Sequence, residues 1–168
     1  RWHFATHKCN LYIALLLTIL QGVVIICNER WVNAMPITTK EGILKVLRGF
    51  NPWWATGTVN PELLRNYKRF AYYEAINRLE NKSIRRTVIL TGARRVGKTT
   101  IEYQLIHHLL QNGVPPQKIV FVSLDHPMLK LAGLNDVLEC YHENIYANQD
   151  VYYFFDEIQY ATDWSMWL

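Results

Sequence analysis

Apolar residues in the C-terminal half of the chain alternate between strand-like and helix-like spacing. Short runs rich in β-branched and aromatic residues occur at 87–91, 117–124 and 151–155, which predicts three buried strands. Between them, apolar residues recur every three or four positions over 100–111 and 134–146, which predicts two helices. The resulting order of strand, helix, strand, helix and strand is typical of a parallel α/β sheet with flanking helices.

A further amphipathic segment precedes these runs. Asn60 followed by Pro61 is a typical helix start, and an apolar stripe follows, so the pattern predicts one helix over 61–82. Its remaining positions are rich in basic residues, which favours either a solvated face on a helix beside the sheet or a face that contacts nucleic acid. Upstream, Trp53 and Trp54 either anchor a linker onto the core or stack on a base or partner.

A glycine-rich loop joins the run at 87–91 to the helix predicted over 100–111. The stretch Gly92-Ala-Arg-Arg-Val-Gly97-Lys98-Thr99 matches G-x-x-x-x-G-K-S/T, the pattern of loops that cradle nucleotide phosphates. Glycines let backbone N–H groups approach phosphate oxygens, and the helix that follows adds the positive end of its dipole. Lys98 is expected to reach the β- and γ-phosphates, and the Thr99 hydroxyl is expected to bind Mg²⁺. The residues expected to bind the nucleotide are Gly92, Ala93, Arg94, Arg95, Val96, Gly97, Lys98, Thr99 and Thr100.

Two adjacent carboxylates follow the last predicted strand. The run at 151–155 carries Asp156 to the carboxyl end of the strand, where ligands bind in open α/β sheets. Asp156 is therefore expected to hold Mg²⁺, and Glu157 to orient or deprotonate an attacking water. Within the glycine-rich loop, Arg94 and Arg95 occupy variable positions, where they either brace acidic neighbours or touch phosphate.

Composition changes this picture only slightly. Half of the residues are apolar and 19% are charged, which is ordinary for a globular domain. The net charge of +4 permits contact with nucleic acid or a membrane without arguing for either. The cysteines at 9, 27 and 140 are scattered and lack metal-ligand spacing, which indicates a reducing compartment and hence a cytoplasmic location.

Residues 1–34 form an apolar leader, in which the stretch 11–27 contains no charged residue. Three interpretations remain open. In the first, Met35 is the true start and the leader is an upstream in-frame translation. In the second, 11–27 is a membrane tether, at the short end of the length that spans a bilayer. In the third, 11–27 is a buried helix. A cleaved export signal is the least consistent interpretation, because it would separate a nucleotide-binding domain from its nucleotide.

Several of these motifs occur together in one family. The chain resembles the bacterial and archaeal AAA+-type ATPases in its loop at Gly92–Thr100, in Val122-Ser-Leu-Asp125-His-Pro127, in Asp156-Glu-Ile-Gln159 and, upstream, in Phe50-Asn-Pro-Trp-Trp54. The likeness covers roughly residues 43–168. It implies an α/β P-loop NTPase fold of the AAA+ or RecA-like kind, with a parallel sheet, flanking helices and a helical segment before the sheet.

The resemblance also implies the chemistry of the site. Lys98 and Glu157 fall on the family's catalytic positions, and Thr99 and Asp156 on its magnesium-binding positions, so ATP and Mg²⁺ are the expected ligands and ADP and phosphate the expected products. Such domains often drive a winged-helix or nuclease-like effector domain, which would lie beyond residue 168 and bring a nucleic-acid or protein partner, or oligomer formation. The STAND signalling ATPases are close relatives, so the alternative is a nucleotide-dependent switch with slow or no turnover.

We therefore expect a leader at 1–34, an N-terminal linker at 35–60, a helix before the core at 61–86 and the N-terminal part of the ATPase domain at 87–168. The resembled fold has the strand order 5-1-4-3-2, and its fourth strand would follow the last residue of this chain. We accordingly expect either a gap of about 10 Å between the first and third predicted strands or a non-native collapse of the two.

Overall fold

The computed structural model describes residues 38–80, 87–162 and 164. The leader predicted over 1–34, with its uncharged stretch at 11–27, lies outside the described residues. Within the part of the chain that is described, no helix combines the length and the apolar character needed to cross a membrane.

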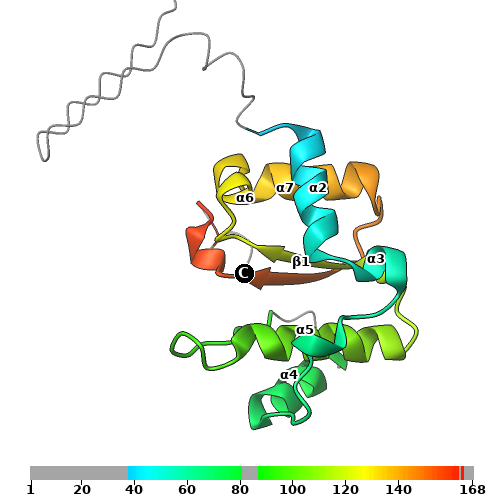
Figure 1. Cartoon of the computed structure of the whole chain (residues 1–168), viewed down its shortest axis with the longest axis vertical. Helices are drawn as coiled ribbons and strands as arrows, with labels where there is room; N and C mark the ends of the chain where they lie inside the picture. Colours follow the sequence, from blue (N-terminus) through cyan, green and yellow to red (C-terminus); the bar gives the residue numbers. More distant parts are fainter. Residues whose placement is uncertain (1–37, 81–86, 163, 165–168) are drawn as a thin grey trace, which may run out of the picture. The chain divides into compact units, whose positions relative to one another are not determined.

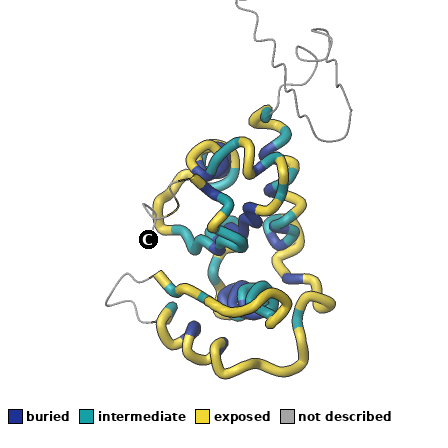
Figure 2. Tube along the Cα trace, turned by 90° about the vertical axis from the view of Figure 1, so that its left-hand side faces the viewer, coloured by how far each residue is buried: buried dark blue, intermediate teal, exposed yellow. Residues whose placement is uncertain are grey.

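Two parallel strands form the centre of the fold. β1 (Ile119–Ser123) pairs with β2 (Tyr152–Asp156), and their register places Ser123 opposite Asp156. β1 is buried along its whole length, whereas β2 is mostly half-buried (Figure 2). The strands predicted over 117–124 and 151–155 are therefore confirmed.

Helices cover both faces of this small sheet (Figure 1). α2 (Lys40–Phe50), α6 (Pro127–Ala132) and α7 (Leu134–Asn144) lie on one face. α5 (Lys98–Gln111) lies on the other, and α4 (Phe70–Glu80) packs against α5. α5 and α7 confirm the helices expected from the apolar spacing after the glycine-rich loop and after β1.

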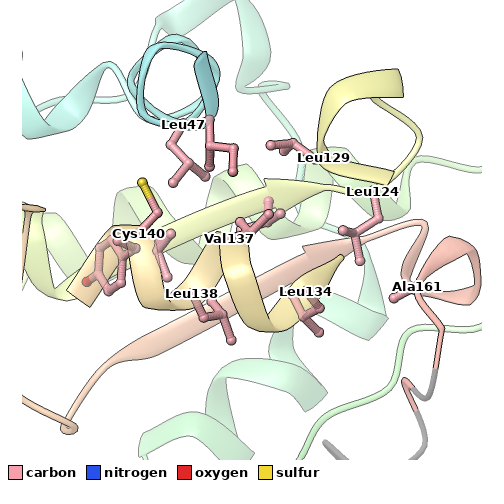
Figure 3. Packing of buried hydrophobic residues seen from close by; sticks show 12 residues of the cluster. Leu47, Leu124, Leu129, Leu134, Val137, Leu138, Cys140 and Ala161 are labelled. Atoms are coloured by element: carbon pink, nitrogen blue, oxygen red, sulfur yellow. The ribbon is translucent and has the colours of Figure 1, made fainter. Parts of the chain in front are cut away.

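Alternate residues of β1 divide the core into two clusters. Val120 and Val122 pack with apolar side chains of α2, α6 and α7, which converge on that face of the strand (Figure 3). Ile119 and Phe121 pack instead with residues of α4 and α5. Because successive side chains of a strand point to opposite faces, this one strand joins the two helical layers.

The segment 35–60, which was interpreted as a linker, closes the outer edge of β1. It contains α2 and a short helix, α3 (Trp53–Thr56), so the linker interpretation was wrong for this helical part. The ring N–H groups of Trp53 and Trp54 both donate to the Ile119 carbonyl oxygen, at 3.1 and 2.8 Å. Trp53 is fully buried. Of the two interpretations of the tryptophan pair, anchoring onto the core is the one confirmed.

Asn51, at the end of α2, satisfies the next outward-facing backbone groups of the same strand. Its side-chain amide donates to the Phe121 carbonyl oxygen at 2.9 Å, and its side-chain oxygen accepts from the Phe121 N–H at 2.6 Å. The same amide donates to the Leu47 carbonyl oxygen at 2.7 Å. Side chains thus occupy an edge that would otherwise present unpaired N–H and C=O groups.

The single helix predicted over 61–82 was wrong. The chain forms a short 3₁₀ helix, η1 (Pro61–Leu63), then a loop over 64–69, and only then α4. The start signal was interpreted correctly, since the Asn60 side chain accepts from the Glu62 N–H at 3.0 Å. The helix does not continue because two carbonyl groups of the following loop bond to a side chain of α5 instead of to later N–H groups of their own segment.

The strand predicted over 87–91 is also not formed. The segment lacks strand hydrogen bonds, and the described sheet consists of β1 and β2 alone. Val88 and Leu90 are half-buried against α4 and α5, while Ile89 is 63% exposed, so one face packs and the other does not. A strand needs a hydrogen-bonded neighbour, and no described segment pairs with this one. The order of the remaining strands stays a prediction.

Candidate functional site

The glycine-rich loop leads directly into α5. Gly97 caps the helix in a left-handed conformation, with φ of +92°, which favours glycine because a side chain would be strained there. Arg95 also has a positive φ, +63°, a conformation that costs a non-glycine residue about 1–2 kcal/mol. Arg95 is therefore locally strained, as is common where a backbone wraps a ligand.

The Lys98 ammonium group is held at the loop. Its Nζ donates to the carbonyl oxygens of Gly92 and Ala93, both at 3.1 Å. Two neutral carbonyl groups leave the positive charge of the ammonium uncompensated. Phosphate oxygens would therefore be strong competitors for the same donor.

The hydroxyl of Thr99 connects the glycine-rich loop to the end of β2. Thr99 Oγ1 donates to Asp156 Oδ2 at 3.0 Å, so the two motifs recognised separately in the sequence meet in the structure. Burial is the main cause that raises the pKa of the Asp156 carboxyl, and the charge of Glu157 raises it further. The Thr99 hydrogen bond acts in the opposite direction by stabilising the carboxylate.

A cleft of about 540 Å³ opens over this junction. Its lining residues are Arg94, Arg95, Gly97, Lys98, Thr99, Thr100, Asp125, Glu157 and Tyr160. Six of the nine expected nucleotide-binding residues line the cleft, whereas Gly92, Ala93 and Val96 do not. The cleft therefore unites the first turn of α5 with the residues that follow both strands.

Two cleft residues were not identified from the sequence. Asp125 follows β1, and its carboxylate accepts from the Ser123 hydroxyl at 2.7 Å. Tyr160 lies in the turn after β2, where its hydroxyl accepts from Arg94 Nη2 at 3.3 Å. For Asp125 a usable signal existed, because residues that follow parallel strands gather at one edge of the sheet. Arg94 contacts a tyrosine rather than a carboxylate, so neither expected role for it is seen in this contact.

Glu157 is the first residue after β2 and has a left-handed conformation, with φ of +53°. This conformation turns the chain out of the strand into the short helix η3 (Ile158–Tyr160). The Glu157 carboxylate accepts a hydrogen bond from the Gln159 side-chain amide at 2.5 Å. It therefore faces the cleft with one oxygen already engaged.

A fourth carboxyl group, Glu102 on α5, also lies near the site. Its Oε2 atom is enclosed and has no hydrogen-bond partner. Burial raises the pKa of Glu102 to about 8, and the negative charge of Asp156 adds to the effect, while Lys98 opposes it. Sequence reasoning missed this residue because a glutamate within an amphipathic helix is ordinarily interpreted as solvated.

The donor set fits magnesium. Thr99 and Asp156 offer hard oxygen ligands next to each other, which Mg²⁺ prefers. Among the described residues, no group of three or more His, Cys, Asp or Glu side chains could hold a metal by itself. A magnesium ion here would therefore take water or phosphate oxygens as further ligands, as is usual for this ion in nucleotide sites.

Comparisons with known proteins place the part of the chain that contains this cleft in a family. Residues 84–168, half of the chain, match a family model described as an AAA domain. An uncharacterized protein of Methanocaldococcus jannaschii is 30% identical over 117 residues, which cover 63% of this chain. The chain spans about a quarter (24%) of the length of that relative. No solved structure matches.

The matched residues include both motifs of the cleft. The glycine-rich loop, the first turn of α5, both strands and the carboxylates after β2 all lie within 84–168. The structure brings these elements together around one cleft. The chain therefore belongs to the AAA domain family.

Proposed function

We propose that this chain binds ATP with Mg²⁺ in the cleft and hydrolyses it to ADP and phosphate. The observation that carries the proposal is the 3.0 Å hydrogen bond between Thr99 and Asp156, because it joins the phosphate-binding loop to a carboxylate at the end of a parallel strand. In P-loop NTPases these two groups hold the ion that bridges the β- and γ-phosphates. The finer assignments, an AAA+ or RecA-like sheet with STAND-related ancestry, belong to the same proposal.

Binding would draw on the loop and on Lys98. Backbone N–H groups around Gly97 and the start of α5 would donate to phosphate oxygens, and the helix dipole would favour their negative charge. Lys98 would exchange its two carbonyl partners for the β- and γ-phosphates. Thr99 and Asp156 would hold Mg²⁺, which when bound would neutralise the charge that develops on the phosphate oxygens.

Hydrolysis would use Glu157. Its carboxylate lines the cleft and is the only glutamate side chain among the described lining residues. In the proposed step, a water oxygen attacks the γ-phosphorus, the bond from that phosphorus to the ADP oxygen breaks, and Glu157 accepts a proton from the water. Glu157 Oε2 already accepts the hydrogen bond of the Gln159 amide, so the other carboxylate oxygen would accept the proton unless Gln159 moves away.

The engaged carboxylate favours a second candidate function. If Gln159 keeps Glu157 occupied, nucleotide binds without efficient turnover, and occupancy of the cleft acts as a signalling switch. In either case the effect of nucleotide binding or hydrolysis would pass to an effector domain. This chain spans only part of the length of its relative.

The test is ATP turnover and ATP affinity of the full-length protein in three variants. Glu157→Gln should bind ATP with little change and lose at least 100-fold in turnover, since a positioned base contributes about 10²–10⁴-fold. Lys98→Ala should lose binding. Glu139→Gln is the matched control, because it removes the same charge from an exposed position on α7. Tight binding without turnover by the parent would favour the switch, and unchanged turnover in Glu157→Gln would exclude the proposed base.

A further inference from the structure

The loop at 64–69 is fixed to the helix that carries the phosphate-binding residues. The side-chain amide of Gln104, on α5, donates to the carbonyl oxygens of Arg65 and Tyr67, at 3.2 and 3.1 Å. Gln104 is only 5% exposed, so these bonds are shielded from water. The next loop residue, Lys68, donates to the Tyr72 hydroxyl at 3.1 Å, which ties the other end of the loop to α4. The loop therefore has a defined position relative to the cleft.

Helical spacing on α5 explains where this loop lies. Gly97, Thr100 and Gln104 are separated by three and four residues, so they share one face of the helix. Thr99, which bonds to Asp156, is one residue away from Thr100 and so faces a direction about 100° around the axis. The first turn of α5 consequently presents one side to the carboxylates after β2 and another side to the loop.

Arg69 reaches this second side of the first turn. Its guanidinium carbon lies 3.8 Å, and its Nη2 4.0 Å, from the point where a β-carbon on Gly97 would lie. The Thr100 hydroxyl oxygen lies 3.9 Å from the same point. Arg69 does not line the cleft that contains Glu157; it lines a separate groove of about 380 Å³, and Lys98 lines both. A positive charge thus lies beside the phosphate-binding turn, away from the hydrolytic carboxylates.

Tyr67 is held next to Arg69. Arg69 Nη2 donates to the Tyr67 hydroxyl at 3.3 Å, and the guanidinium lies 5.8 Å from the centre of the Tyr67 ring. Tyr67 is 60% exposed, although large aromatic side chains are usually buried. An exposed ring beside a guanidinium is the arrangement that stacks on nucleobases and binds phosphate.

We propose that Tyr67 and Arg69 bind the nucleoside end of the nucleotide, with Arg69 contacting the α-phosphate and Tyr67 stacking on the base. This inference rests on the proposed function, which directs the γ-phosphate towards Thr99 and Asp156. A nucleotide with its γ-phosphate at Thr99 and Asp156 that extends across the first turn of α5 would place its α-phosphate and base on the side of Thr100 and Arg69. Gln104 is a positioning residue, since it holds the loop and does not reach the nucleotide.

The experiment compares ATP with inorganic tripolyphosphate as ligands of the full-length protein, with affinities measured by calorimetry in the presence of Mg²⁺. Tripolyphosphate retains the phosphate chain and lacks the nucleoside. Tyr67→Ala should weaken ATP binding about tenfold, as expected for one lost stacking contact, and leave tripolyphosphate binding within about twofold. Tyr67→Phe should retain ATP binding, because it keeps the ring. Arg69→Ala should weaken both ligands, since it removes a phosphate contact.

The control is Arg48→Ala, which removes an equal charge from an exposed position on α2, a helix that packs in the other core cluster. It should leave both affinities unchanged. If Tyr67→Ala reduces both affinities equally or neither, the stacking role is wrong, while loss of binding in Lys98→Ala still supports the proposed function. If the parent binds neither ligand, both proposals fail.

Discussion

Replacement of Asn51 by alanine tests whether one side chain holds α2 on the edge of the sheet. Asn51 is 1% exposed and makes three hydrogen bonds, of which two satisfy the N–H and C=O groups of Phe121. Both groups would lose their partner in Asn51→Ala, inside a layer that excludes water. An unsatisfied buried group costs about 1–3 kcal/mol, so with two such groups the variant should lose about 2–6 kcal/mol of unfolding free energy.

The assay is urea unfolding of the full-length protein, followed by tryptophan fluorescence, because Trp53 and Trp54 lie next to Asn51 and report on this edge. The matched control is Asn60→Ala, which removes the same side chain from an exposed cap of η1 and should cost about 0.5–1 kcal/mol. If both variants lose equal stability, Asn51 contributes no more than a surface cap, and the account of the β1 edge is wrong.

Two further predictions concern pH and backbone strain. Because burial raises the pKa of Glu102 from 4.5 to about 8, the unfolded chain releases this proton at lower pH than the folded chain, and stability should fall as pH rises from about 4 towards 8. Glu102→Gln should remove roughly 4 kcal/mol of that loss, measured as unfolding free energy against pH. A Glu102→Gln profile parallel to that of the parent would contradict this. Gly97→Ala should destabilise the domain by about 1–2 kcal/mol in urea unfolding, because φ is +92° there. Gly49→Ala is the control, since it lies in α2 with no atom within 4 Å of the added carbon, and it should be neutral or stabilising in the same assay.

Local patterns in the sequence were sufficient for the elements that depend mainly on their own residues. The apolar spacing identified α5 and α7, and the β-branched runs identified β1 and β2. The glycine-rich loop and Asp156 were found because phosphate and magnesium chemistry require particular residue types at fixed spacing. The meeting of Thr99 with Asp156 agrees with the same chemistry, since both residues were expected to bind one Mg²⁺ ion.

Tertiary contacts decided the rest. The helix expected over 61–82 is interrupted because Gln104, distant in sequence, takes the loop carbonyl groups, and no local pattern reports such a partner. The segment at 87–91 has strand-like composition but lacks a described neighbour to pair with. Glu102 and Arg69 resemble ordinary surface residues in the sequence, and only packing encloses one and places the other beside Gly97. Residue type and spacing therefore determined the chemistry of this site, whereas burial and long-range hydrogen bonds determined which other side chains surround it.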